Sequence, residues 1–389
     1  MQRKSRLREN KEQGAKNKEQ GAKNKEQGAK NKEQRAKSKE QRTKNKEQRT
    51  RSKEQRTRTR ITHSSELRTQ NSRLTTKNMP VNIPDNLPAI EILNNEHIFV
   101  MDDLRASTQD IRPLKIAVLN LMPLKITTET DLIRLLSNSP LQVEIDFIQI
   151  ETHTPKNTPI EHLMEFYKPF SAINTHFYDG FIVTGAPVEL LPFEEVNYWH
   201  ELTRIFDWAR THVTSTFYIC WAGQAAMYHF YGVQKYPLDQ KLFGVFKHTV
   251  NDKIFPLFRG FDDEFYAPHS RHTTVYAEDI RQHPELTILS ESEEAGVYIV
   301  SSRGGREFYV TGHSEYSPLT LHNEYTRDKE RGLDSVDLPK NYYRKNNPDN
   351  APVVRWRSHA NLLFVNWLNY FVYQATPFNL QEIEALGEL

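Results

Sequence analysis

The stretch STFYICWAGQAAMYHFYG, residues 215–232, is the part of the sequence that most clearly indicates the fold. Its first part is apolar, β-branched and aromatic, as in a strand buried inside a sheet, and its second part has the composition of a helix that ends at Gly232. Cys220, the only cysteine among 389 residues, stands at the junction. The small residues that follow it predict a sharp strand-to-helix elbow, which would present the thiol at the start of a helix.

The sequence around this stretch alternates between strand and helix patterns. We expect strands over 115–122, 141–150 (nearer an edge) and 179–187, a helix with a capping-box-like start from Thr128 to Asp131, and a helix over 193–212. This order predicts an α/β fold whose mainly parallel sheet is covered by helices on both faces. Because ligands bind at the carboxyl ends of such strands, the turns that hold Glu189 and Cys220 are expected to share one functional edge.

The charge distribution divides the chain at Met79. Residues 1–78 carry 26 Lys and Arg against 9 Asp and Glu, and they repeat a polar heptad of the type KEQGAKN. The repeat has no apolar seam for a coiled coil and too few large apolar residues for a core, so we expect a disordered basic tail. A nucleic-acid-binding arm is the functional alternative, but a repeat translated upstream of a true start at Met79 is the favoured interpretation. Residues 79–389 then form the catalytic domain.

Several classes of protein are disfavoured by composition. A single cysteine excludes an intramolecular disulfide and suits a reducing cytoplasm, and no apolar run is long enough to span a membrane. No glycine-rich phosphate-binding motif occurs. His269 and His272 could share a helix face as metal ligands, but no third ligand at a recognisable spacing accompanies them, so no metal is expected.

Cys220 can be interpreted as a buried core residue or as a nucleophile. The helix N-terminus would favour the thiolate, and the amide of Trp221 could point at a developing oxyanion. His313 and Glu315 follow another predicted strand, FYVT, at a spacing of two, which places a base and its orienting carboxylate on one side. The combination favours the nucleophile.

Seven stretches together resemble one family, the homoserine O-acyltransferases of methionine biosynthesis. They are DIRPLKIAVLNLMPLKITTETDLIRLL, DGFIVTGAPVELLPFEEVNYWHEL, ICWAGQAAMYHFYGV, GVFKH, PHSRHT, TGHSEY and NEYTRD. The resemblance extends from Met79 to about Pro377. It implies a flavodoxin-like fold similar to the class I glutamine amidotransferases, homodimers, and no bound cofactor.

The resemblance also implies roles for individual residues. Cys220 is the expected acyl-accepting nucleophile, His313 the proton acceptor and Glu315 the third member of a triad. Lys241 and Ser270 match substrate-contact positions, and Arg327 matches the arginine that binds the carboxylate of L-homoserine.

Glu189 indicates the acyl donor. Within the family, acetyl users resemble TGAPxE and succinyl users TGAPxG, and this chain has TGAPVE. A carboxylate at that position would fill the space of a succinyl tail and repel its charge. We therefore expect acetyl-coenzyme A as the co-substrate. The alternatives are a succinyltransferase, and a glutamine amidotransferase-like hydrolase on the same fold, which Tyr218 at an elbow glycine position disfavours.

Overall fold

The computed structural model describes residues 82–83, 101–102, 113–153, 157–332, 337–377 and 379–385. The chain divides into two units, Met1–Asn78 and Met79–Leu389, and every described residue belongs to the second. The prediction of a disordered tail over 1–78 therefore lies outside the described residues.

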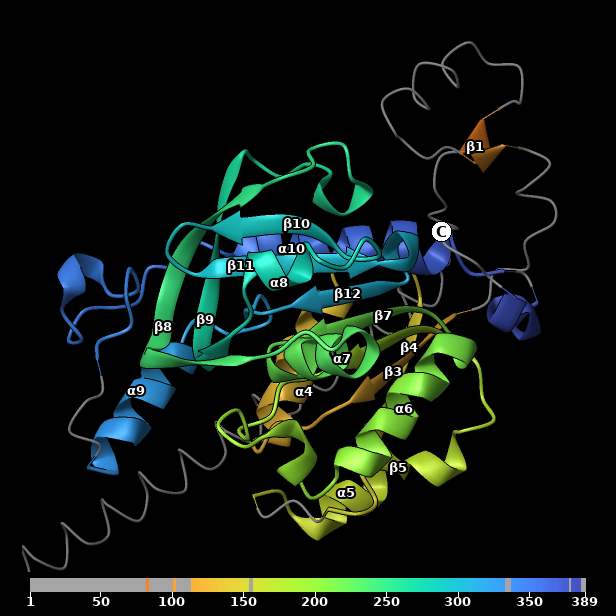
Figure 1. Cartoon of the computed structure of the whole chain (residues 1–389), viewed down its shortest axis with the longest axis horizontal. Coiled ribbons are helices and arrows are strands. Elements are labelled where there is room, and N and C mark those ends of the chain that lie inside the picture. Colours follow the sequence, from red (N-terminus) through yellow and green to blue (C-terminus); the bar gives the residue numbers. More distant parts are fainter. Residues whose placement is uncertain are drawn as a thin grey trace, which may run out of the picture. The chain divides into compact units, whose positions relative to one another are not determined.

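A mixed sheet of ten strands forms the centre of the described part of the second unit (Figure 1). The strand order is β5-β4-β3-β6-β7-β12-β11-β10-β8-β9, in which the first six strands pair in parallel and the last four add in antiparallel fashion. The strands are β3 (Leu114–Leu119), β4 (Val143–Gln149), β5 (Tyr167–Pro169), β6 (Tyr178–Val183), β7 (Val213–Ile219), β8 (Tyr236–Val250), β9 (Glu264–Thr274), β10 (Thr287–Ser292), β11 (Gly296–Ser302) and β12 (Glu307–Val310). A separate parallel pair joins β1 (Asn82–Ile83) to β2 (Met101–Asp102).

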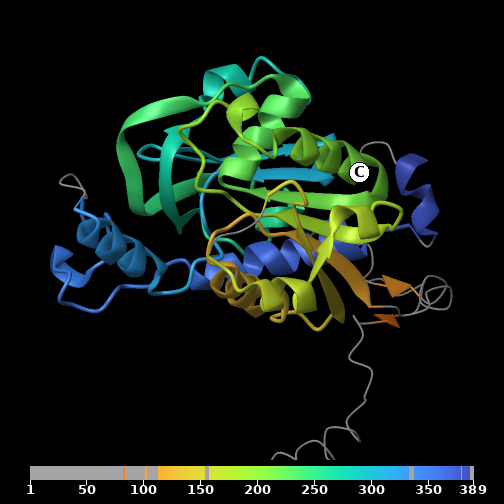
Figure 2. The same ribbon diagram turned by 90° about the horizontal axis from the view of Figure 1, so that it is seen from below.

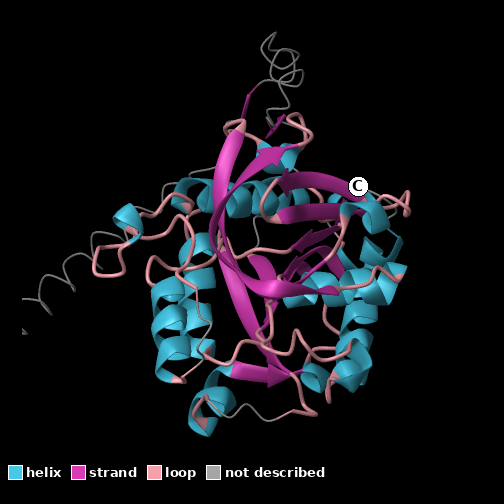
Figure 3. Cartoon of the chain, turned by 60° about the vertical axis from the view of Figure 1, so that its left-hand side comes forward, coloured by secondary structure: helices cyan, strands magenta, loops and turns pink. Residues whose placement is uncertain are grey.

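Helices cover both faces of the sheet (Figure 3). They are α4 (Lys125–Leu136), α5 (Ile160–Phe166), α6 (Trp199–His212), α7 (Trp221–Tyr231), α8 (Ala277–Ile280), α9 (Thr320–Glu330) and α10 (Arg357–Asn366), which continues as a π-helical segment over Trp367–Tyr373. In Figure 2 the green α6 and α7 lie on one side of the sheet, and the orange α4 and blue α10 lie on the other. Two buried clusters correspond to these two layers, because side chains alternate between the faces of a strand.

The main predictions of secondary structure are confirmed. Strands β3, β4 and β6 overlap the predicted ranges 115–122, 141–150 and 179–187, and β4 lies second from the sheet edge. Helix α7 ends at Gly232, whose φ of 74° is the left-handed conformation expected of a glycine C-cap. The α/β class with helices on both faces is likewise confirmed.

Two local predictions are wrong. Helix α4 begins at Lys125 rather than at Thr128, and no side chain caps it; the Thr128 hydroxyl instead donates to the carbonyl oxygen of Leu124 inside the helix. The helix expected over 193–212 begins only at Trp199, after a short 3-10 turn at Phe193–Glu195. Neither helix has a side-chain hydrogen bond at its N-cap, so a capping side chain does not mark either start.

The antiparallel part of the sheet was not predicted. Strands β8 and β9 pair along most of their length, with Phe243 opposite Ser270. This hairpin places Lys241 and Ser270 beside the parallel half of the sheet. It therefore supplies one wall of the candidate site.

Candidate active site

The strand-to-helix elbow at Cys220 has the predicted geometry. Cys220 follows β7 directly, is 3% exposed, and has φ 52° and ψ −118°, an unfavourable conformation for a residue with a Cβ. Its backbone N–H donates to the carbonyl oxygen of Val310 at 2.6 Å, which fixes the elbow against β12. Gly223 makes this close packing feasible, since a Cβ there would lie 3.2 Å from the carbonyl oxygen of Tyr218.

Trp221 is the first residue of α7, so its backbone N–H has no acceptor within the helix. Its indole ring is fully buried in the core on the α6 and α7 side of the sheet. Only the main chain of Trp221 can therefore serve the site, as a donor beside Cys220.

His313 and Glu315 meet beside this thiol. Nδ1 of His313 lies 2.6 Å from Oε1 of Glu315, and the imidazole is in hydrogen-bond contact with the side chain of Cys220. The His313 ring also stacks on Tyr316, with 4.2 Å between ring centroids. Both His313 and Glu315 are buried, so the three side chains form a chain from carboxylate to imidazole to sulfur.

The electrostatics of His313 suit an ion pair with a thiolate. Burial by itself lowers the pKa of His313, but the charges of Cys220 and Glu315 and their hydrogen bonds more than offset this and raise it well above its usual value. The imidazolium form is therefore favoured as long as a negative charge resides on sulfur.

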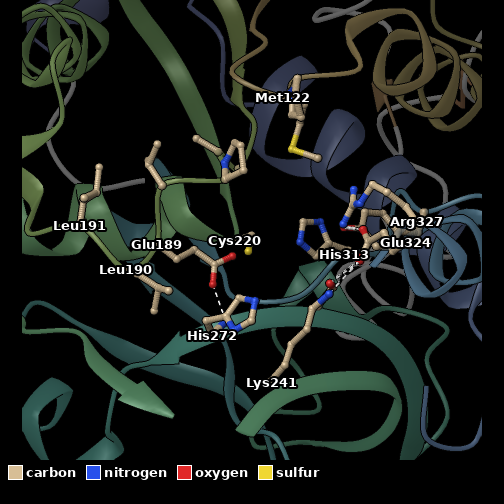
Figure 4. A pocket seen from close by; sticks show the side chains of 17 residues that line it. Met122, Glu189, Leu190, Leu191, Cys220, Lys241, His272, His313, Glu324 and Arg327 are labelled. Carbon is tan, nitrogen blue, oxygen red and sulfur yellow. Dashed lines mark hydrogen bonds and ion pairs between the residues drawn. The ribbon is translucent and has the colours of Figure 1, made fainter. Parts of the chain in front are cut away.

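A cavity of about 340 Å³ opens over Cys220 and His313. Figure 4 shows Glu189 on one side of these two residues, and Lys241, Glu324 and Arg327 on the other. Glu189 is half-buried, and its Oε2 accepts a hydrogen bond from the backbone N–H of His272. The Glu189 carboxylate thus lines the cavity from a fixed position.

The opposite side of the cavity is organised around Glu324, on α9. This carboxylate lies 3.5 Å from Nζ of Lys241 and accepts hydrogen bonds from the hydroxyls of Ser270 and, at 2.8 Å, Tyr316. Arg327 follows one helical turn later and lines the same cavity, and its Nε donates to Asp328 at 2.8 Å. A ligand carboxylate at Arg327 would therefore share the guanidinium with Asp328.

The structure thus brings Cys220, His313, Lys241, Ser270, Arg327 and Glu189 together around one cavity, with Glu315 behind His313. The sequence analysis missed Glu324, Asp328 and Tyr316. In NEYTRD, Arg327 and Asp328 follow Glu324 by three and four residues. In a helix this spacing brings both side chains beside Glu324, so the motif could have identified these carboxylates.

The helical placement of His269 and His272 is wrong. Both residues lie in β9, where positions three apart point to opposite faces, and His269 is buried against His248. Across the described residues, no group of three or more His, Cys, Asp or Glu is arranged to hold a metal ion. The same residues contain no helix of the length and apolar character needed to cross a membrane.

Comparison with known proteins relates this chain to the homoserine O-acyltransferases. The family model for homoserine O-succinyltransferase matches residues 80–378. A homoserine O-acetyltransferase of Parabacteroides distasonis is 68% identical over 311 residues, which are 80% of this chain and 100% of that protein. A homoserine O-acetyltransferase of Bacteroides fragilis is 66% identical over 305 residues, 78% of this chain and 100% of that protein. Among solved structures, a glutamine amidotransferase of Thermotoga maritima covers 67% of this chain and 99% of its own at 12% identity, with a TM-score of 0.46.

Proposed function

Because this chain belongs to the homoserine O-succinyltransferase family of acyltransferases, which act in methionine biosynthesis, we propose that it transfers an acetyl group from acetyl-coenzyme A to the γ-hydroxyl of L-homoserine. The observation that carries the proposal is the Cys220 elbow in contact with the His313–Glu315 pair, inside a cavity that Glu189 also lines.

In the first half-reaction, the Cys220 thiolate attacks the thioester carbonyl carbon of acetyl-coenzyme A. The negative charge that develops on the carbonyl oxygen is stabilised by backbone donors, for which we propose the N–H of Trp221. The intermediate collapses with cleavage of the bond to the coenzyme A sulfur, and His313 gives its proton to that sulfur. The acetyl group then remains on Cys220 as a thioester.

The same chemistry prepares His313 for the second half-reaction. Once Cys220 is acylated, the charge on sulfur no longer raises the pKa of His313, although that of Glu315 still does, so the pKa falls from its value beside the thiolate. Neutral His313 takes the proton from the γ-hydroxyl of homoserine as its oxygen attacks the acyl carbon. The bond to the Cys220 sulfur breaks, and the thiolate and imidazolium form again with release of O-acetylhomoserine.

Homoserine is expected at the α9 side of the cavity. Arg327 offers a guanidinium to the substrate carboxylate, and Lys241 adds a further donor. The Ser270 hydroxyl donates to Glu324, so its oxygen is available to the substrate as an acceptor. The Glu324 carboxylate, already bonded to Ser270 and Tyr316, is the complementary group for the substrate ammonium. This arrangement would aim the γ-hydroxyl at Cys220 and His313.

Acetyl is preferred over succinyl because of Glu189. Its carboxylate lines the cavity beside Cys220, where the far end of a succinyl chain would place a second negative charge. The two relatives described above carry the acetyl name, although the matching family model is named for succinyl transfer.

Three further expectations accompany this function. No cofactor is needed, because the acyl group is carried by the co-substrate and by Cys220. We propose a cytoplasmic location, which keeps the single thiol reduced, and a homodimer, as the family resemblance implies.

The test separates the two half-reactions. The purified full chain is incubated with acetyl-coenzyme A alone, and the protein mass is measured. We expect an increase of one acetyl group that disappears when homoserine is added. Cys220→Ala should show no increase, and Cys220→Ser at most a trace, because a hydroxyl is far less ionised than a thiol near neutral pH. Near-normal transferase activity in Cys220→Ala would overturn the covalent mechanism.

A further inference from the structure

A fully buried arginine lies beside the Cys220 cavity. Arg271 occupies β9 between Ser270 and His272, which both line the cavity, and its own side chain is 1% exposed. Its guanidinium donates to the carbonyl oxygens of Thr273 (2.8 Å) and Ala295, and its Nε lies 3.4 Å from Nδ1 of His269. Within the described part of the chain, these hydrogen-bond acceptors include no carboxylate. The guanidinium is therefore hydrogen-bonded to neutral acceptors that do not neutralise its positive charge.

A pair of histidines completes this arrangement and must be neutral. Since an arginine Nε can only donate, Nδ1 of His269 is an acceptor and its proton is on Nε2. That nitrogen lies 3.0 Å from Nε2 of His248, which accepts, and Nδ1 of His248 donates to the carbonyl oxygen of Phe246 at 3.0 Å. Burial lowers the pKa of His248 to about 3 and that of His269 well below its usual value. His269 thus accepts a hydrogen bond from Arg271, and because both histidines are neutral they do not cancel its positive charge.

The charges that act on Arg271 belong to the active site. Burial lowers the pKa of Arg271 to about 10, and the two groups that oppose this effect are Cys220 and then Glu189. The charged or titratable groups around Cys220 are Glu189 from the loop after β6, Lys241 from β8, Arg271 and His272 from β9, His313, Glu315 and Tyr316 from the segment after β12, and Glu324 and Arg327 from α9. Lys241 is paired with the Glu324 carboxylate and Arg327 with that of Asp328. Arg271 is the cation of this set whose hydrogen-bond acceptors among the described residues include no carboxylate.

We propose that Arg271 is a positioning residue that stabilises the Cys220 thiolate through space and offsets the negative charge that Glu189 brings to the same cavity. This inference rests on the proposed function, in which Cys220 is the nucleophile. An acetyl-selective site needs a carboxylate next to a thiolate, and that repulsion disfavours the reactive form of the sulfur. A buried guanidinium that attracts both groups reduces the conflict.

Arg271 is also connected to the helix that presents the thiol. The carbonyl oxygen of Thr273, which accepts from Arg271, also accepts from the Gln224 side chain at 3.2 Å, and the Thr273 hydroxyl donates back to Gln224 at 2.8 Å. Gln224 lies in the first turn of α7, with its N–H donating to the carbonyl oxygen of Cys220. The elbow and the guanidinium are thus held in a fixed relation.

The experiment measures the reactivity of the single thiol directly. Because the chain has one cysteine, iodoacetamide alkylation followed by mass spectrometry reports on Cys220 alone. We expect R271M to move the alkylation profile to higher pH, with a rate at pH 6.5 roughly 10-fold below that of the unchanged protein, as loss of one nearby buried charge implies. R271K keeps the charge, so its profile should stay close to that of the unchanged protein. R271Q, which keeps polar atoms but no charge, should behave like R271M and carries the test if R271M does not fold.

Arg306 provides a matched control. It is 2% exposed, and its guanidinium donates to backbone carbonyl oxygens, among them those of Thr214 and Val213, in a region where its charged neighbours are Arg303, Glu307 and Arg210. R306M removes a comparable buried cation from a place remote from the thiol, so the melting temperature should fall while the alkylation profile stays unchanged. The proposal would be overturned if R271M, R271Q and the unchanged protein had the same pH profile of alkylation. It would also be overturned if R306M shifted that profile as much as R271M does.

Two outcomes distinguish this proposal from the proposed function. If Cys220 is not the nucleophile, Cys220→Ala retains activity, yet the alkylation profile of R271M still shifts. If only the role of Arg271 is wrong, the unchanged protein forms an acyl-enzyme normally and R271M alkylates like it at every pH.

Discussion

Among single residues, Glu189 offers the sharpest test of donor choice. Replacing it with Gly removes one charge and opens space beside the thiol, so we expect succinyl-coenzyme A use to rise by roughly 10- to 100-fold. Acetyl transfer should fall less, because a short acyl group loses only one wall of its pocket. Initial rates with each donor at fixed homoserine give the comparison.

Glu189→Gln separates charge from volume at the same position. If repulsion dominates, this variant begins to accept succinyl-coenzyme A; if steric exclusion dominates, it remains an acetyltransferase. Unchanged donor preference in both variants would show that Glu189 has no part in selection.

Glu324 tests the assignment of the two sides of the cavity. Its carboxylate contacts Lys241, Ser270 and Tyr316 but lies across the cavity from Glu189 (Figure 4). We expect Glu324→Gln to raise the KM for homoserine by about 10-fold or more, since one charge-assisted contact to the substrate is lost. Acyl-enzyme formation from acetyl-coenzyme A alone should be nearly unchanged. A loss of acylation equal to the loss of turnover would contradict this division of the site.

At the scale of elements, a buried ion pair anchors the strand that leads to His313. Arg210 on α6 donates to both carboxylate oxygens of Glu307 on β12, at 2.6 and 2.9 Å. Burial by itself raises the pKa of Glu307, but the hydrogen bond and charge of Arg210 outweigh it and hold that pKa below its usual value. The pair therefore stabilises the fold above the pKa of an unfolded carboxyl, and this contribution is lost as the pH falls through the lower folded-state value.

We expect R210M to lower the free energy of unfolding by about 3 kcal/mol at pH 7, because the buried Glu307 carboxylate loses its bidentate partner and keeps only the more distant Arg303, at 3.8 Å, as a cation. The difference from the unchanged protein should shrink as the pH falls toward 4, where Glu307 in the variant can be neutral. Urea unfolding at the two pH values measures both effects. The exposed pair Lys247–Glu264 is the control, and K247M should cost less than about 1 kcal/mol. Equal losses in the two variants would show that the Arg210 pair has no special role.

At the scale of the whole chain, residues 79–389 are proposed as the complete catalytic unit. The family match begins at residue 80, and 311 residues of this chain match the full length of the P. distasonis relative. Deletion of 1–78 should therefore leave the melting temperature and turnover unchanged. The full chain and the deletion variant should also bind nucleic acid equally weakly. Lower stability or turnover in the deletion variant, or salt-dependent nucleic-acid binding by the full chain alone, would instead assign the basic repeat a function.

The amino-acid pattern alone predicts most local elements and the strand-to-helix elbow at Cys220. An apolar run that turns into small helical residues leaves few backbone solutions, and the positive φ of Cys220 is the one that lets α7 pack against β7 and β12. The spacing of His313 and Glu315 also predicted their contact, because residues so close along the chain need little else to meet. Helix starts were less predictable, since α4 and α6 both begin without a capping side chain.

Long-range strand pairing determines which distant residues share the cavity. Lys241, Ser270 and Arg271 reach Cys220 because β8 and β9 add to the sheet in antiparallel fashion, and no local pattern specifies that pairing. The charge balance at the thiol is likewise a property of the folded chain. Glu189 and Arg271 are 82 positions apart in sequence, and burial removes the water that would otherwise screen one from the other.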